Sequence, residues 1–392
     1  MNKFLFSLLR SAITNKPITE DEKSQYSNEI LVKCLQVADK HDIAHIVNQG
    51  IQQNGMAELI QEKVMPDKFA KVALMAIYRY KRLDYELDVI CNALEKAQIP
   101  FLPLKGSILR DYYPEPWMRT SCDIDVLIPE NYIEDVITIF TEEYQFRLDI
   151  KGSHDVSMFS SRGIHVEFHY HLVEKGLANE AESILKDVWN VVVPKKDHRY
   201  HHEMPDDLFY FYHIAHMAKH FENGGCGIRP FIDLWILDGL KSVDYEKRDE
   251  LLAKGNLLQF AQVARKLSKV WFENAEMDAL SQQMEDYILT GGVYGSSENR
   301  ITVQQQKKGG SFKYVLSRIF IPYDTIKFYY PILQKHRWLT PIMEVRRWGK
   351  LIFRGHLKRA AKELRYNRDI QKEEAQTTKR FLQEIGLMSD EA

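Results

Sequence analysis

The sequence contains few of the residues that mark small secreted, fibrous or membrane-spanning proteins. Its four cysteines form no CxxC pair among 392 residues, so no disulfide framework is expected and a reducing compartment is. Glycine and proline together make up 32 residues, which disfavours collagen and long disordered linkers. No run of 18 apolar residues occurs, and the apolar stretch before Arg10 is too short for a secretory signal. These absences predict a cytoplasmic protein without a membrane span.

Charge is distributed unevenly along the chain. The formal net charge is −2, yet residues 335–368 alone carry a net +9 and the remainder −11. Aromatic residues lie within or close to this basic segment, including Phe328, Tyr330, Trp338 and Trp348. Basic residues interleaved with aromatics suit a nucleic-acid backbone or an anionic membrane surface, and they also suit a helix that docks on its own protein. The sequence therefore predicts a basic tail that could hold an anionic partner or place the protein at the membrane periphery.

The hydrophobic pattern changes along the chain. Residues 28–38 and 69–97 show helical periodicity, and helical periodicity returns after residue 206. Between them, short apolar segments such as CDIDVLIPE and IHVEFHYHL alternate with a helical segment over 130–144, which indicates an α/β or α+β core. Glycine-rich stretches at 291–299 and 304–311 are predicted to be exposed loops or a domain boundary. We divide the chain into an N-terminal helical region (1–90), a core (91–200), a helical domain (201–300) and a basic C-terminal helical region (301–392).

Two carboxylates stand two residues apart in the alternating segment CDIDVLIPE, which is predicted to form a strand. Side chains at i and i+2 of a strand point the same way, so Asp123 and Asp125 would repel each other unless a cation lies between them. Mg²⁺ binds such oxygen ligands, usually one or two carboxylates together with substrate phosphates. The alternative is an ordinary half-buried strand with two acids on its outer face.

Residues before and after this pair favour the metal site. Lys105, Gly106 and Ser107 open a predicted helix after a short apolar segment, where glycine allows close approach of a phosphate to backbone N–H groups. Glu167 lies between apolar neighbours on a later strand and could ligate a metal or accept a proton. Arg119 precedes the acids and would either bind a phosphate or lie solvated on the surface.

This ordered set of a Gly-Ser turn, an Asp-x-Asp strand and a third carboxylate resembles the nucleotidyltransferase superfamily of the DNA polymerase β type. More narrowly, LPLKGS, YYPEPWMRTSCDIDVLI, IHVEFHYHL and HIAHMAKHF…IRPFIDLWIL resemble an uncharacterised bacterial nucleotidyltransferase family often associated with surface-polysaccharide gene clusters, over about residues 40–350. Lys105 departs from the wider superfamily, where a small or apolar residue is common, and would add a phosphate contact.

The resemblance implies a polymerase-β-like mixed sheet, flanked by helical regions, with residues 91–200 as the catalytic core. It also implies transfer of a nucleoside monophosphate from a nucleoside triphosphate such as ATP to an unknown acceptor, which could be a sugar, a lipid-linked intermediate, RNA or protein. Mg²⁺ or Mn²⁺ would be the cofactor. The implied catalytic and metal-binding residues are Asp123, Asp125 and Glu167; the nucleotide-binding residues are Lys105, Gly106, Ser107 and Arg119; and the surrounding residues are His169, His216, His220, Arg229 and Asp233.

Histidines allow a second interpretation of the same region. His165, Glu167, His169 and His171 would share one strand face, and histidines two apart on a strand can bind Zn²⁺ or Fe²⁺. A metal-dependent hydrolase is therefore an alternative function. A non-catalytic nucleotide- or nucleic-acid-binding module of the same fold is another, although retention of all three carboxylates disfavours it.

Two further sets on predicted helices remain open between a functional and a structural role. His213, His216 and His220 share one helix face, either near the metal or as half-buried hydrogen-bonding residues. Arg229 and Asp233 lie one helical turn apart and either pair with each other or, as the resemblance suggests, face the cleft.

Overall fold

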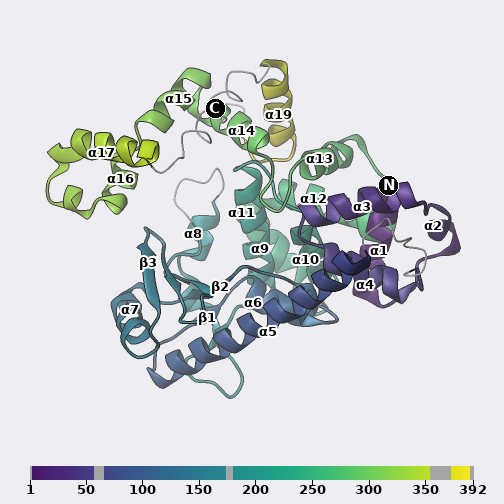
Figure 1. Ribbon diagram of the computed structural model, residues 1–392, viewed down its shortest axis with the longest axis horizontal. Helices are drawn as coiled ribbons and strands as arrows, with labels where there is room; N and C mark the ends of the chain where they lie inside the picture. The colour runs from purple at the N-terminus through teal and green to yellow at the C-terminus, as the bar shows by residue number, and fades with distance from the viewer. Residues whose placement is uncertain (1, 57–65, 174–179, 354–371, 389–392) are drawn as a thin grey trace.

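The protein, seen in a computed structural model, is a mixed α/β structure with helical regions on both sides of one five-stranded mixed sheet (Figure 1). The structure describes residues 2–56, 66–173, 180–353 and 372–388. The mixed sheet with helical flanks that the sequence predicts is confirmed. The α-helices are α1 (Asn2–Thr14), α2 (Glu20–Ser24), α3 (Asn28–Lys40), α4 (Ala44–Gln53), α5 (Pro66–Lys96), α6 (Gly106–Leu109), α7 (Ile133–Glu142), α8 (Ala181–Leu185), α9 (Asp206–Phe221), α10 (Arg229–Asp238), α11 (Tyr245–Lys254), α12 (Leu258–Glu273), α13 (Ala279–Thr290), α14 (Ser297–Lys308), α15 (Ser311–Ile319), α16 (Tyr323–Tyr329), α17 (Thr340–Phe353) and α19 (Lys372–Glu384).

The strands of the five-stranded sheet follow the order β1-β2-β5-β4-β3, in which β2 and β5 are parallel and the other neighbours antiparallel. Asp123 lies opposite His165 and Asp125 opposite Glu167, while Ser157 of the next strand also lies opposite Glu167. Because side chains alternate between the two faces, this register gathers polar side chains from three strands on one face. The strands are β1 (Leu102–Pro103), β2 (Asp123–Leu127), β3 (Arg147–Lys151), β4 (Asp155–Phe159) and β5 (His165–His169), and a separate pair is β6 (Val193–Pro194) with β7 (His202–Glu203).

The opposite face of the sheet is apolar and packs against α5 and α7, which lie along it in Figure 1. Burying a large apolar side chain stabilises a fold by about 1.5–3 kcal/mol, so this packing holds the strands from behind. The polar face is thereby left for α9 and α10 to cover. The buried side chains on the apolar side include Ile124, Val126, Val156, Met158, Val166 and Phe168 of the strands, with Ile90, Leu94, Val136 and Phe140 of the helices.

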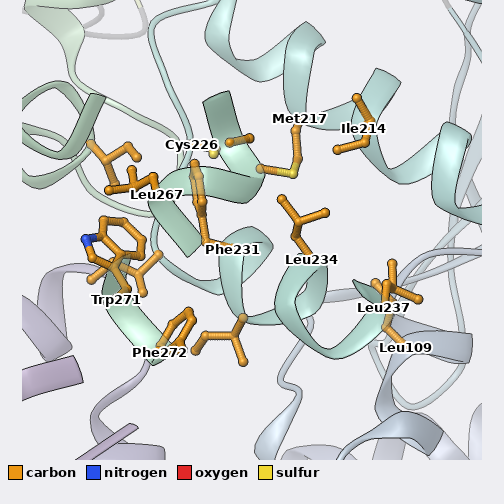
Figure 2. Packing of buried hydrophobic residues seen from close by; sticks show 14 of the residues in the cluster. Leu109, Ile214, Met217, Cys226, Phe231, Leu234, Leu237, Leu267, Trp271 and Phe272 are labelled. Carbon is orange, nitrogen blue, oxygen red and sulfur yellow. The ribbon is translucent and has the colours of Figure 1, made fainter. Parts of the chain in front are cut away.

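A second core forms among α9, α10 and α12, where Met217, Phe231, Leu234 and Trp271 pack together (Figure 2). Leu109 of α6 belongs to the same cluster and is drawn next to Leu237 of α10 in Figure 2. The short helix α6 is therefore anchored in the helical core, although the turn before it is bonded to the sheet.

The N-terminal helices are joined closely to this helical core. A side chain at Gly50 would meet the carbonyl oxygen of Leu8 at 2.3 Å, so α1 and α4 cross in backbone contact. Phe6 of α1 stacks on Trp271 of α12 with ring centroids 4.3 Å apart. The helix α5 runs through residue 90, where the sequence places a domain boundary, and the division into four regions stays a prediction.

The C-terminal segment α15–α17 has a small core of its own around Ile326, Tyr330 and Leu333. It lies above the sheet in the view of Figure 1. The predicted loop over 304–311 is wrong in its first part, because residues 304–308 complete α14; the glutamines and lysines there favour helix, and only Gly309 and Gly310 end it. No described helix is both long and apolar enough to span a membrane. Residues 354–368 of the predicted basic tail lie outside the described residues.

Candidate active site

The predicted acidic residues meet on the polar face of the sheet. The parallel register brings one ligand atom each from Asp123, His165 and Glu167 within 4.8 Å of one another. A second group, formed in the same way by Asp125, Glu167 and His169, shares Glu167 with the first. Five side chains of two neighbouring strands therefore form one cluster, as the alternation in the sequence predicts.

Asp125 is the buried centre of this cluster. Its Oδ1 accepts hydrogen bonds from Nζ of Lys105 at 2.8 Å and from Nε2 of His169 at 2.7 Å. Burial opposes the charge of Asp125, but Lys105 and His169 hold its pKa far below the ordinary value. Burial also opposes the charge on Lys105, and Asp125 nevertheless raises the pKa of that ammonium. Asp125 is thus a carboxylate whose charge is already balanced by the protein.

Asp123 and Glu167 occupy the more open part of the cluster. Burial, followed by repulsion from Asp125, raises the pKa of Asp123, for which no ion pair occurs among the described residues. A hydrogen bond from His169, whose Nε2 lies 3.3 Å from Glu167 Oε2, lowers the pKa of Glu167 despite its partial burial. Burial disfavours a charge on His169, but its bonds to Asp125 and Glu167 raise its pKa. A cation added here would relieve the repulsion between Asp123 and Asp125.

The turn before α6 is bonded to the acidic strand. The backbone N–H of Leu104 donates to the carbonyl oxygen of Asp125 at 3.0 Å, and Lys105 adopts a strained positive φ of 48°. Gly106 lines the cavity beside the acids, and a Cβ on it would come within 3.0 Å of the Ser121 side chain. The buried hydroxyl of Ser107 has no hydrogen-bond partner among the described residues. The predicted helix start is therefore present, with glycine required by close packing.

Arg119 lies in the cavity wall and is held by a buried acid. Its Nε donates to both carboxylate oxygens of Asp233, at 2.8 and 3.0 Å, and the hydroxyl of Tyr113 donates to the same acid at 2.7 Å. Arg229 donates to the carbonyl oxygen of Thr120 at 2.8 Å. Of the two alternatives for Arg229 and Asp233, the contacts favour the one in which both line the cavity over the one in which they bond to each other.

Helix α9 lies across the polar face and contributes the predicted histidines. The rings of His216 and His220 meet edge to face at 4.5 Å between centroids, and Nε2 of His213 bonds to the carbonyl oxygen of Pro230. Burial, and then the charge of Lys105, lowers the pKa of His216 well below its ordinary value. These three histidines belong to neither of the two groups of closely spaced ligand atoms found in the described residues. They are neighbours of the cluster and not part of it.

The acids and α9 enclose a cavity of about 270 Å³. It lies between the acidic strand, the turn and α9, and four cationic side chains line it together with the more open Asp123 and the buried Asp125. The polar side chains in its wall include Lys105, Arg119, Ser121, Asp123, Asp125, Tyr212, His213, His216, Lys219, His220, Arg229 and Asp233, with His41 and Tyr294.

Sequence reasoning missed some of this wall and misplaced one residue. Tyr212 lies four residues before His216, on the same face of α9, and could have been found from helical spacing. His41 and Tyr294 come from distant segments and have no local signal. His171 was expected on the strand face, but β5 ends at His169 and His171 lies 3.9 Å from Glu130 instead. The tyrosine that follows His169 leaves the ladder, so the alternation stops there.

Carboxylate oxygens and imidazole nitrogens at this spacing fit a divalent cation. The arrangement can therefore bind metal ions next to a cavity whose basic residues attract phosphate groups.

The model of one protein family, described as uncharacterised nucleotidyltransferase, matches residues 32–273, more than half of the chain. The match includes the whole acidic cluster, the turn before α6 and helices α9 and α10. It ends before Val293 and Tyr294 of the cavity wall. No curated protein and no solved structure matches the chain.

Proposed function

The chain belongs to the uncharacterised nucleotidyltransferase family, and from this premise we propose that it transfers a nucleoside monophosphate from a nucleoside triphosphate to an acceptor hydroxyl. The sheet would be of the polymerase-β type. The observation that carries the proposal is the convergence of Asp123, Asp125 and Glu167 on one sheet face. The two aspartates also line a cavity together with Lys105 and Arg119.

In the proposed reaction the acceptor oxygen attacks the α-phosphorus and the bond from that phosphorus to the bridging oxygen breaks. The electron pair of that bond leaves with pyrophosphate, and the acceptor's proton passes to a carboxylate oxygen of Glu167. Mg²⁺ or Mn²⁺ bound at Asp123, Asp125 and Glu167 would supply neutralisation of the phosphate charge.

The basic and small residues of the cavity would orient the triphosphate. Lys105 and Arg119 are preorganised by their bonds to Asp125 and Asp233, so little side-chain order is lost when phosphate binds. Gly106 allows the backbone to approach the terminal phosphates, and the unpartnered hydroxyl of Ser107 is the hydrogen-bond donor proposed beside it. His169 would position Asp125 and Glu167. The part of the cavity wall around the phosphates would be completed by His216, His220, Arg229 and Asp233.

The test is incubation with each of the four labelled nucleoside triphosphates and Mg²⁺, with measurement of pyrophosphate and of label on RNA, protein, lipid and sugar. We expect pyrophosphate release and one labelled acceptor class. Asp123→Asn should lower transfer by about a hundredfold or more, since it removes charge that acts on the phosphates. Asp149→Asn, on the exposed strand β3, is the matched control and should retain activity. Undiminished transfer by Asp123→Asn would overturn the mechanism.

The same experiment separates the alternative functions. Nucleotide binding without pyrophosphate release would indicate a non-catalytic binding module. Stoichiometric zinc or iron in protein purified without added metal, together with hydrolysis, would support the hydrolase built on the histidine-rich strand.

We propose a separate role for the basic C-terminal region, namely attraction of an anionic partner. Support comes from exposed cations on α17 such as Arg346 and Lys350, which lie over the Tyr330 ring. Arg347 is different, because it pairs with Glu344 and donates to the carbonyl oxygen of Ile319, so it belongs to the internal scaffold.

A further inference from the structure

We propose that Nδ1 of His165 is a metal ligand, together with carboxylate oxygens of Asp123 and Glu167, and that this nitrogen gives the position a preference for Mn²⁺ over Mg²⁺. The inference rests on the proposed metal-dependent transfer and deepens it by naming a ligand and a metal class. The three ligand atoms already lie within 4.8 Å of one another, and Nδ1 of His165 is 3.9 Å from Oε1 of Glu167.

Ser157 orients the His165 ring for this role. The hydroxyl oxygen of Ser157 lies 2.7 Å from Nε2 of His165, and both residues stand on the polar face of neighbouring strands. An imidazole that donates its proton from Nε2 to Ser157 keeps a lone pair on Nδ1, on the side of the acids. Phe159 supports the ring at 5.1 Å between centroids. Metal-binding histidines are commonly fixed by such a bond from the other ring nitrogen.

The outer position (Asp123, His165 and Glu167) differs from the inner position (Asp125, Glu167 and His169) in its burial and in its existing salt bridges. At the inner position Asp125 is bonded to Lys105 and His169, and the His169 side chain is only 8% exposed. At the outer position Asp123 has no ion pair among the described residues, and the His165 and Glu167 side chains are 28% and 25% exposed. An ion entering from solvent therefore first meets the more exposed ligands at the outer position, including a carboxylate without a salt bridge among the described residues.

The chemistry of the donor set favours a transition metal. Mg²⁺ demands near-ideal octahedral geometry and keeps several waters, whereas imidazole nitrogen is a ligand of first-row transition metals. Among those metals, Mn²⁺ is the one that also suits carboxylate oxygens, so a mixed set of two carboxylates and one imidazole fits Mn²⁺ better than Mg²⁺. Two carboxylate oxygens and one imidazole nitrogen on a rigid sheet therefore discriminate between ions of equal charge. A site of three carboxylates alone would not.

The test uses the full-length protein and Mn²⁺ without nucleotide. The free-Mn²⁺ signal in electron paramagnetic resonance gives the affinity, displacement by Mg²⁺ gives the preference, and pulsed measurements report coupling to a nitrogen ligand. We expect Mn²⁺ to bind about tenfold more tightly than Mg²⁺ and to show nitrogen coupling.

His165→Ala should abolish the nitrogen coupling and lower the affinity for Mn²⁺ by about tenfold, while the affinity for Mg²⁺ changes by less than about twofold. Ser157→Ala should also lower the affinity for Mn²⁺. His171→Ala is the matched control, since it lies just beyond the same strand and near Glu130 instead. Melting curves verify that each variant is folded. Equal affinities for the two ions, or nitrogen coupling that persists in His165→Ala, would overturn the assignment.

Failure of this inference and failure of the proposed function are distinguishable. Nucleotide transfer that depends on Asp123 without nitrogen coupling leaves the transferase proposal standing and removes His165 as a ligand. Nitrogen-coupled Mn²⁺ without transfer from any nucleoside triphosphate retains the ligand and removes the transferase.

Discussion

The polar face of the sheet and the segment α15–α17 hold charge in opposite ways. On the sheet, Asp125 and Lys105 are buried, lie 2.8 Å apart and have fixed partners. On α15–α17, the exposed cations Arg337 and Arg346 lie over tyrosine rings. The same segment exposes apolar side chains, including Phe312 at 75% and Val345 at 72%. Geometry dominates in the first region and total charge in the second, so single substitutions should matter most on the sheet and salt most on α15–α17.

The largest effect should come from removing one partner of the buried ion pair behind the cavity. Asp233→Ala leaves the guanidinium of Arg119 without its acid, which should lower the free energy of unfolding by about 3–5 kcal/mol. Urea denaturation measures this. Asp286→Ala, an exposed acid on α13, should change it by less than about 0.5 kcal/mol. A loss below about 1 kcal/mol in the first variant would contradict the buried pair and weaken the contrast.

The second effect concerns acid stability and a histidine on the cavity wall. Burial, and then the charge of Lys40, lowers the pKa of His41 to about 4 from 6.5. The folded state binds a proton on His41 less readily than the unfolded state does. The free energy of unfolding is therefore unaffected by His41 above pH 6.5 and falls as the pH drops from 6.5 towards 4, by about 3 kcal/mol at most.

Melting temperatures measured across that pH range check this expectation. His41→Leu should flatten the curve, while the exposed His198→Ala should leave its shape unchanged. If both variants lose stability in parallel with the parent protein, His41 does not contribute to the acid sensitivity.

A third prediction tests whether Lys105 acts through its fixed contact with Asp125 or only through its charge. Lys105→Met removes the ammonium that holds Asp125 and lines the cavity, and kcat/KM for the proposed nucleotide transfer should fall by about a hundredfold. The loss should change little between low and high salt, because the pair is largely shielded from solvent. A loss that varies steeply with salt would make Lys105 resemble the α17 cations and would break the comparison.

The smallest effect per residue is expected on α17. Replacing Arg346 or Lys350 by Gln should each weaken binding to vesicles with anionic lipid by about 1 kcal/mol, roughly fivefold, with unchanged melting temperature. Co-sedimentation at low and high salt measures it, and RNA binding of the same variants shows which anion is preferred. Lys254→Gln, an exposed cation on α11, is the control. Lost stability with unchanged binding would show that these residues are scaffold.

Local alternation predicted which side chains share a strand face, whereas the mixed sheet that brings the two strands together was implied by the family resemblance. Asp123 and Asp125, and again Glu167 and His169, take their direction from the two-residue period of a strand. The partner of Arg119 was not predictable in this way, since Asp233 is 114 residues away and only tertiary packing joins them. The same holds for Tyr294, which reaches the cavity from a turn beyond the family match.

The strand order has a consequence for synthesis of the chain on the ribosome. β2 emerges with only the two-residue β1 as an earlier neighbour, and its other partner, β5, follows about 40 residues later. In the meantime β3, β4 and β5 can pair as consecutive hairpins, which are fast local events compared with docking of a distant strand. A nascent chain that ends before Glu167 therefore carries Asp123 and Asp125 without their third carboxylate, and the proposed metal-binding face is completed only when the hairpins join β2.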